Sequence, residues 1–318
     1  MHERNTPTAP PRHLRLRSSL LGRRIAILAA VVALAIVGTS RPMRAEAAMV
    51  ATPDGWTQLA IAAHRGATTG RDVGHTEDTL GSYRTAVSLF EAEAQATGRP
   101  ASQYFLEGDI RETRDNVPVI LHDARVNRTT NGRGAVANLT WHQVGHLRTD
   151  LTPAPGRVPR LAAVARLASQ SGVGFLPELK ATHFTTAQLR HIAAILSRFH
   201  LAGRTVMQSF YADNLRAWHR VRSAAPGALL EKKPSPHVDG VKQFAGWVLL
   251  DQRASRAKLA AGIRHAKAAD LHVGVWTPNG QGNWEWDVAH GVQMVITDQA
   301  QALTQLETAE ADGNIARP

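Results

Sequence analysis

The sequence contains no cysteine. The fold therefore has no disulfide bond, no thiolate ligand for a metal ion and no cysteine nucleophile. The N-terminal apolar stretch, Ile25 to Val37, is also shorter than a typical transmembrane helix, because it has only 13 residues. No long basic stripe is interleaved with aromatic residues, so the net charge of +11 does not predict nucleic-acid binding. What is present, 43% hydrophobic and 20% charged residues over 318 positions, suffices for one large domain or two small ones.

The N-terminal segment, residues 1–48, is typical of a secretory signal. It holds eight arginines and two glutamates, a net charge of +6, which leaves +5 for the rest of the chain. Ala45-Glu46-Ala47 fits the rule for signal cleavage between small residues. We therefore expect an exported, extracytoplasmic protein with no stable membrane span after the signal is removed. Arg23-Arg24 also fits a twin-arginine signal, and an uncleaved N-terminal anchor is the alternative.

After about residue 56, short apolar runs alternate with amphipathic segments. Nine runs are predicted to be strands: 59–63, 104–110, 117–121, 173–176, 205–208, 228–230, 247–250, 272–276 and 293–297. Apolar residues recur at helical spacing within 80–90, 161–168, 189–199, 215–221 and 259–266. This alternation predicts an α/β fold, a (β/α)8 TIM-type barrel within residues 49–308. A doubly wound open sheet is the alternative, although the segment 66–70 fits its glycine-rich phosphate turn poorly.

One of the nine runs is more than an eight-stranded barrel needs. Only a tight turn around Asp115-Asn116 separates run 117–121 from the run before it, so we expect an antiparallel hairpin there. A turn centred between those two residues would place His122 opposite Asp109. Residues 124–158, with many glycines, asparagines and prolines, are expected to form a loop or small insertion after the second strand unit. Residues 309–318 are expected to form a flexible tail.

Three carboxylates lie in strand-like runs that the barrel would bring together. Glu107 and Asp109 alternate with Gly108, so their side chains share one face of a strand. Glu178 ends another apolar run. Such hard oxygen ligands suit Ca²⁺ or Mg²⁺. On spacing alone, two acids on an edge strand and a salt-bridged glutamate would give the same pattern.

Two histidines and two cations accompany these acids. His64 and His122 each follow a hydrophobic run and could act as a general acid and a general base. Arg65 and Lys180 suit phosphate binding, the first by its planar fork and the second as a point charge. Structural histidines at strand ends, and cations paired with the neighbouring glutamates, are the alternative roles.

The chain from about 59 to 300 also carries an ordered series of motifs. They are His64-Arg65-Gly66, Thr76-Glu77-Asp78-Thr79, Glu107-x-Asp109, His122-Asp123, Arg128-Thr129-Thr130, Glu178-Leu179-Lys180, Gln208-Ser209-Phe210, Val275-Trp276-Thr277-Pro278-Asn279 and Ile296-Thr297-Asp298. In this order and spacing the chain resembles the glycerophosphodiester phosphodiesterase family. One departure is Asp78, which stands where the family usually has a neutral amide.

The resemblance implies a β/α barrel with a small insertion and a site of eight residues. One divalent cation, Ca²⁺ or Mg²⁺, would be held by Glu107, Asp109 and Glu178. The resemblance further implies an acid–base pair, phosphate ligands and an aromatic pocket wall, which would be His64 with His122, Arg65 with Lys180, and Trp276. Plain barrel packing is the alternative role for the tryptophan.

We therefore predict a secreted, metal-dependent phosphoric diester hydrolase that converts small-molecule glycerophosphodiesters to sn-glycerol 3-phosphate and an alcohol, with no protein partner. A phospholipase D of the sphingomyelinase D type, acting on lysolipids, is one alternative. Glu178 argues against it, because that family usually has an aspartate there. A non-catalytic extracellular barrel that binds phosphate esters is the other alternative, and it would be expected to have lost a ligand or a histidine.

Overall fold

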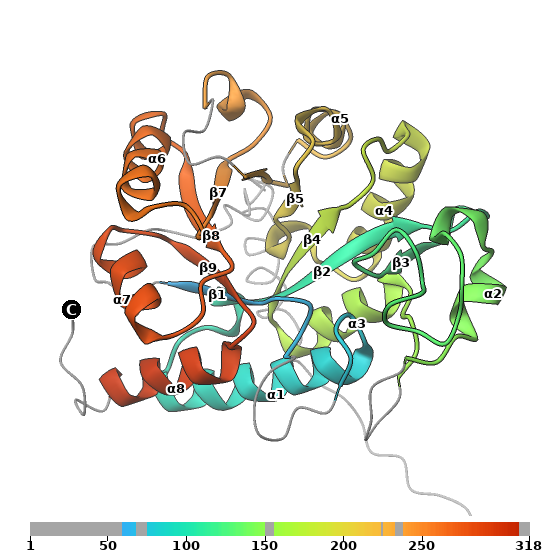
Figure 1. Ribbon diagram of the computed structural model, residues 1–318, viewed down its shortest axis with the longest axis horizontal. Coiled ribbons are helices and arrows are strands. Elements are labelled where there is room, and N and C mark those ends of the chain that lie inside the picture. The colour runs from blue at the N-terminus through green and yellow to red at the C-terminus, as the bar shows by residue number, and fades with distance from the viewer. Residues whose placement is uncertain (1–58, 68–74, 150–155, 224, 233–237, 312–318) are drawn as a thin grey trace, which may run out of the picture. The chain divides into compact units, whose positions relative to one another are not determined.

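Nine strands are described in the computed structural model, and each falls within or overlaps a predicted run (Figure 1). The structure describes residues 59–67, 75–149, 156–223, 225–232 and 238–311. The expected signal, residues 1–48, lies outside them. The strands are β1 (Ala60–Ala63), β2 (Tyr104–Glu112), β3 (Pro118–Ile120), β4 (Gly174–Leu179), β5 (Met207–Ser209), β6 (Gly227–Glu231), β7 (Trp247–Asp251), β8 (His272–Trp276) and β9 (Met294–Thr297).

Eight of these strands close into a parallel barrel. The strands β4 to β9 follow in sequence order, β1 pairs with both β9 and β2, and β2 pairs with β4. The predicted (β/α)8 barrel is thus confirmed. The doubly wound alternative is wrong, because an open sheet has two edge strands, whereas here β1 pairs with β9 on one side and with β2 on the other. Strands buried on both faces explain the continuous apolar runs in the sequence.

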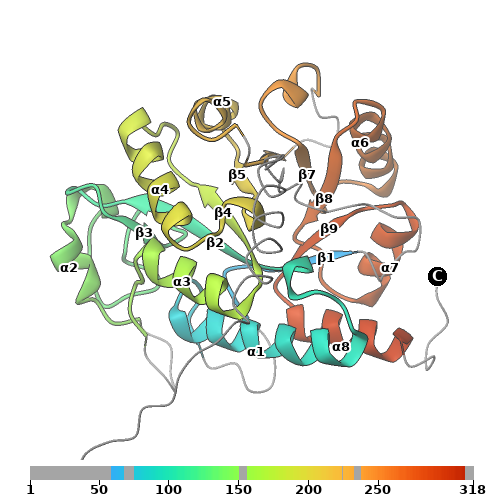
Figure 2. The ribbon, with the colours of Figure 1, turned by 180° about the vertical axis from the view of Figure 1, so that it is seen from behind.

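Helices surround the barrel (Figures 1 and 2). They are α1 (Leu80–Thr97), α2 (Trp141–Gly145), α3 (Leu161–Ser171), α4 (Thr186–Arg198), α5 (Ala212–Val221), α6 (Arg256–Ala268), α7 (Gln281–Ala289) and α8 (Ala300–Ala311). Short 3-10 helices occur at Ala101–Gln103, Val136–Asn138, Ala202–Arg204 and Val241–Gln243. The helix α8 extends three residues into the segment expected to be a tail. None of the described helices is long and apolar enough to span a membrane.

Local chemistry sets the ends of α1. Thr79 begins the helix, since its hydroxyl oxygen accepts from the Ser82 backbone N–H at 3.3 Å while the Ser82 hydroxyl oxygen accepts from the Thr79 backbone N–H at 3.2 Å. This reciprocal pair satisfies two donors that the helix itself cannot. Gly98, at φ 72°, ends the helix in the left-handed conformation.

Strand alternation divides the core into two layers. Ala60 and Ala62 point into the barrel with Phe105 and Leu176, whereas Ile61 belongs to the larger layer between strands and helices. Side chains two residues apart share a face. The inward positions of each strand therefore continue, two residues later, into the polar residues at its carboxyl end.

The strand β3 pairs antiparallel with β2, so the expected hairpin is confirmed, but its register differs by one residue. Ile110 faces Ile120, and the Leu121 N–H donates to the Asp109 carbonyl at 2.8 Å. Asp109 therefore faces Leu121, and the expected pairing with His122 is wrong. The turn holds an extra residue, with Asn116 at φ 55°, as in a three-residue hairpin loop.

The chain between β3 and α3 forms a small subdomain beside the barrel. Six buried side chains make its own apolar cluster: Val119, Leu121, Val126, Val136, Val144 and Val158. The short helix α2 and isolated β-bridges lie within this segment. The cluster holds the segment against β2 and β3, next to the strand ends that carry the site.

Candidate active site

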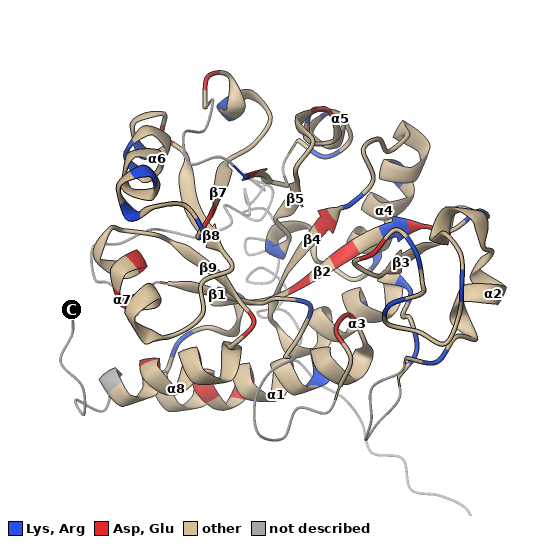
Figure 3. Ribbon diagram, in the orientation of Figure 1, with Lys and Arg blue, Asp and Glu red and all other residues tan. Residues whose placement is uncertain are grey.

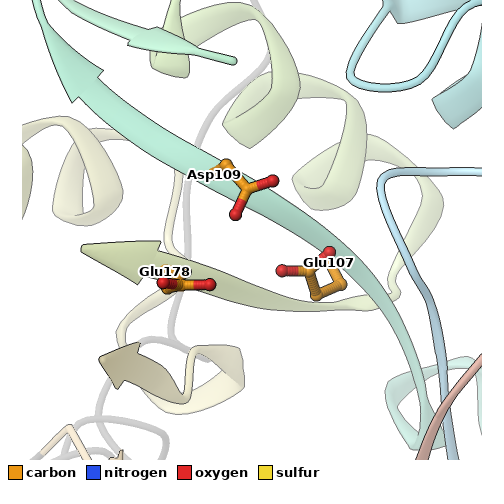
Figure 4. Close-up of side chains that lie close together, drawn as sticks. All are labelled: Glu107, Asp109 and Glu178. Carbon is orange, nitrogen blue, oxygen red and sulfur yellow. The ribbon is translucent and has the colours of Figure 1, made fainter. Parts of the chain in front are cut away.

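The carboxylate cluster lies on adjacent strands near one end of the barrel (Figure 4). Asp109 on β2 is in register with Glu178 on β4, and Glu107 precedes Asp109 on the same inward face. One carboxylate oxygen from each of the three residues lies within 4.8 Å of the others, and all three side chains are buried. Figure 3 shows this acidic charge on β2 and β4.

Two cations partly neutralise the cluster. The Lys180 Nζ lies 3.0 Å from Glu178 and 3.5 Å from Asp109, and the Arg65 Nε lies 3.4 Å from Asp109. Although burial opposes ionisation, Lys180 and Arg65 hold the pKa of Asp109 below its ordinary range. Burial and the charge of Asp109 raise the pKa of Glu107, and they raise the pKa of Glu178 to about 8. Two side-chain cations are thus too few to keep all three groups ionised.

The cluster fits a divalent cation. Its ligands are hard oxygens from three side chains, and Asp109 Oδ2 is buried without a hydrogen-bond donor among the described residues. A dication among these oxygens would favour the ionised form of all three carboxylates, because an opposite charge nearby stabilises the charged form. The three residues could therefore hold a metal ion.

His64 directly follows β1, two residues after the inward-facing Ala62. Its Nδ1 lies 2.6 Å from Asp298 Oδ1, just after β9. Asp298 also accepts from Asn279 Nδ2 at 3.0 Å, and Asn279 Oδ1 accepts from the Asp298 backbone N–H. These contacts fix the imidazole plane, and His64 lines the cavity described below.

His122 follows β3 and has its own carboxylate. Its Nδ1 lies 2.8 Å from Asp123 Oδ1, and Arg111 Nε donates to the His122 carbonyl at 2.9 Å. Burial, only partly opposed by Asp109 and Asp123, lowers the pKa of the imidazole. Each of the two histidines is therefore oriented by an aspartate at Nδ1, which favours Nε2 for exchange with a ligand.

Arg128 connects the subdomain to the barrel. It donates through two nitrogens to Asp123, at 2.7 and 3.0 Å, and through two nitrogens to Glu77, at 2.9 and 2.6 Å. Glu77 in turn accepts from Arg65 at 3.1 Å. Although burial opposes ionisation, Arg128 and Arg65 lower the pKa of Glu77. A continuous set of polar contacts thus joins His122 to Arg65.

A cavity of about 430 Å³ opens over this group. Both histidines, Arg65, Lys180 and two of the three carboxylates line it, together with Trp276. The tryptophan Nε1 donates to the Leu249 carbonyl at 3.1 Å, and its ring meets Phe210 edge to face at 5.4 Å between centroids. The structure therefore places seven of the eight predicted site residues at the cavity, and the eighth, Asp109, has a carboxylate oxygen within 4.8 Å of oxygens of Glu107 and Glu178, which line it.

Several residues in contact with the site have no role that the sequence predicts. Asp298 and Arg128 stand within quoted motifs, yet only the closed barrel shows what they touch. Gln208 donates to Glu107 at 2.7 Å, and Asn279 holds Asp298. The available signal was position, because each of Asp298 and Gln208 lies at an inward place at a strand's carboxyl end.

Comparison with known proteins identifies the family of the chain. The family model described as "Glycerophosphoryl diester phosphodiesterase family" matches residues 64–302. The protein YhdW of Bacillus subtilis (strain 168), whose assignment as a glycerophosphodiester phosphodiesterase is provisional, is 25% identical over 75% of this chain and 93% of its own.

Solved structures share the fold. An Oleispira antarctica phosphodiesterase in complex with the product sn-glycerol-3-phosphate matches with a TM-score of 0.61 and 19% identity, covering 79% of this chain and 96% of the other. A glycerophosphodiester phosphodiesterase from Parabacteroides distasonis matches with a TM-score of 0.63 and 20% identity, covering 80% and 98%. With a family model spanning most of the described residues, this chain belongs to the glycerophosphoryl diester phosphodiesterase family and is a phosphoric diester hydrolase.

Proposed function

We propose that this protein is exported and hydrolyses glycerophosphodiesters to sn-glycerol 3-phosphate and an alcohol, with one bound Ca²⁺ or Mg²⁺. The observation that carries the proposal is that two imidazoles, each held by an aspartate, line one cavity together with two carboxylates of a buried three-carboxylate cluster. The product named for the Oleispira enzyme supports the same chemistry here. Export is supported by the sequence of residues 1–48 alone.

The residues at the cavity would have separate roles in cleaving a phosphodiester. Arg65 and Lys180 would bind the phosphate oxygens by charge-assisted hydrogen bonds. One imidazole would take a proton from the attacking hydroxyl while the other gives a proton to the departing alkoxide, so that the proton count balances. Asp298 and Asp123 keep each ring in the orientation this requires. Glu107, Asp109 and Glu178 would hold the cation, which when bound supplies Lewis-acid stabilisation of phosphate charge.

The test is a hydrolysis assay with purified protein and glycerophosphoglycerol, glycerophosphocholine or glycerophosphoethanolamine. We expect sn-glycerol 3-phosphate as a product and loss of activity in excess EDTA, restored by added Ca²⁺ or Mg²⁺. His64→Ala and His122→Ala are each expected to reduce kcat by about two to four orders of magnitude. His191→Ala, an exposed histidine on α4, is the matched control and should retain activity. Full activity in EDTA would contradict the metal role.

A further inference from the structure

The cavity has a second wall that the chemistry above does not use. Within the closed barrel, β6 and β7 lie across from β1 and β2. Lys232 follows β6 and Arg253 follows β7, and both side chains line the cavity. Phe210 follows β5 and Trp276 ends β8, so these two rings flank the cations in strand order and also line the cavity. The Phe210 ring also lies 5.8 Å from the Lys180 Nζ. We call Lys232, Arg253, Phe210 and Trp276 the far wall.

Protein cations already cover the aromatic rings of the far wall. The Lys232 Nζ lies 4.9 Å from the Phe210 ring centroid, and the Arg253 guanidinium carbon lies 5.5 Å from the Trp276 ring centroid. Aromatic pairs at cavity walls often bind quaternary ammonium groups through their faces. Here a choline or ethanolamine group would meet two positive charges at the rings it would otherwise bind.

The far wall carries an excess of positive charge. Arg253 is held by Asp251, with Nη2 to Oδ2 at 2.6 Å and Nε to Oδ1 at 2.9 Å. Among the described residues, no carboxylate lies within ion-pair distance of Lys232. The only carboxylates among the described residues that line the cavity, Glu107 and Glu178, belong to the metal cluster on β2 and β4. Lys232 is therefore a cavity cation that has no carboxylate partner among the described residues and could bind an anionic group of the substrate.

We propose that the far wall is an anion subsite, and that the preferred substrates are glycerophosphodiesters whose leaving alcohol carries a second phosphate. The inference rests on the proposed function. The reaction is unchanged: water supplies a hydroxyl to phosphorus, and the departing alkoxide, which bears the second phosphate, takes the remaining proton. Lys232 and Arg253 would donate to that phosphate while Arg65 and Lys180 bind the scissile group.

The experiment compares three substrates that share the glycerophosphate half. They are glycerophosphoglycerol, the same molecule with a phosphate on the terminal hydroxyl of its leaving glycerol, and glycerophosphocholine. Loss of the diester is followed by phosphorus NMR with the full protein and added Ca²⁺ or Mg²⁺. The phosphorylated substrate is expected to have a kcat/KM about tenfold or more above that of glycerophosphoglycerol, the effect of one or two charge-assisted hydrogen bonds. Glycerophosphocholine is expected to be the poorest.

Two variants test the residues. In Lys232→Gln/Arg253→Gln the kcat/KM ratio of the phosphorylated to the unphosphorylated substrate is expected to fall to within about threefold of unity. Arg216→Gln is the matched control. Arg216 is likewise exposed, paired with an aspartate at 2.9 Å and placed over a ring, that of Phe244 at 4.6 Å, yet it does not line the cavity. It should leave the ratio unchanged.

The dependence on salt concentration tests the subsite with the wild-type protein alone. Raising NaCl from about 20 to about 300 mM should lower the wild-type ratio, because both far-wall cations are exposed enough to be screened. Fastest hydrolysis of glycerophosphocholine, or a ratio that the double variant leaves intact, would overturn the subsite alone. If none of the three substrates is hydrolysed, the proposed function fails and the subsite with it.

Discussion

Asp78 explains how the site accommodates a charged residue in the place of a neutral amide. Its side chain is buried, Tyr83 donates to its Oδ1 at 2.7 Å, and its Oδ2 has no donor among the described residues. Burial and the charge of Asp109 raise its pKa well above the ordinary value. Its φ of 58° is one that asparagine and aspartate both tolerate. A protonated aspartic acid has nearly the shape of asparagine, so the departure in the sequence is chemically small.

We expect Asp78→Asn to fold, to keep activity and to become more stable than wild type as the pH rises. A carboxyl whose folded pKa is raised contributes stability that is fully present below about pH 4 and is lost as the pH rises through the folded pKa. Asparagine cannot ionise, so the gain in Tm should be near zero at pH 4 and at least about 2 °C at pH 8. Asp213→Asn, at an exposed aspartate, should show no such trend. A Tm that falls equally at both pH values would contradict the protonated form.

The subdomain contacts the site through Arg128. This side chain joins Asp123, which orients His122, to Glu77, which accepts from Arg65. We expect Arg128→Gln to lower kcat about ten- to a hundredfold while the fold persists, because Asp123 would be held less firmly in the position from which it orients His122. Losing the guanidinium also makes Asp123 a stronger acceptor, so the pKa of His122 should rise. The limb of the kcat–pH profile that depends on His122 should then move to higher pH.

Arg148→Gln, an exposed arginine of the same subdomain, is the control for Arg128. It should leave both kcat and the pH profile in place. Arg128→Lys should recover activity only in part, because an ammonium cannot make both two-nitrogen contacts. If Arg128→Gln changes stability but neither kcat nor the pH profile, the bridge is structural only.

Elements with a strong apolar signal were predictable, and mixed ones were not. The eight barrel strands lie in apolar runs because a barrel buries both faces of each strand. The strand β3 is apolar because Val119 is buried in the subdomain cluster and Ile120 in the main core. The helix α8 was not predicted because its buried side interleaves Thr304 and Glu307 with Leu303 and Leu306, which weakens the periodicity. The helix α7 was not predicted either, because its buried side includes the charged Asp287 beside Trp284. The hairpin register failed through a single residue, Asn116, whose left-handed conformation the spacing does not reveal.

The site residues likewise divide into those that could be predicted from the sequence and those that could not. Residue types at strand ends were enough to select Glu107, Asp109 and Glu178, because parallel strands end together. Which side chains hold the two histidines depends on loops that meet only when β1 joins β9 and when the subdomain folds against β3. The contact of His64 with Asp298 joins positions 234 residues apart. No local pattern in the sequence carries that information.

At the scale of the whole molecule, closing the barrel forces the three carboxylates together, and folding should therefore be linked to cation binding. The unfolded chain does not assemble these oxygens, so an ion that binds only the folded form adds about 2.7 kcal/mol at a hundredfold excess over its Kd. For a domain of this size that corresponds to roughly 5–10 °C in Tm. We expect Ca²⁺ or Mg²⁺ to raise the Tm in a concentration-dependent way and EDTA to reverse the shift, as followed by circular dichroism.

Variants separate this linkage from general ionic effects. Glu178→Gln removes a ligand and should abolish most of the cation-dependent rise in Tm. Glu112→Gln is the matched control, because Glu112 is a largely buried carboxyl on β2 whose oxygens have no donor among the described residues and which lies outside the cluster. It should keep the full rise. Equal Tm values in EDTA and in saturating cation, for wild type, would show that the cluster binds no ion in the folded state.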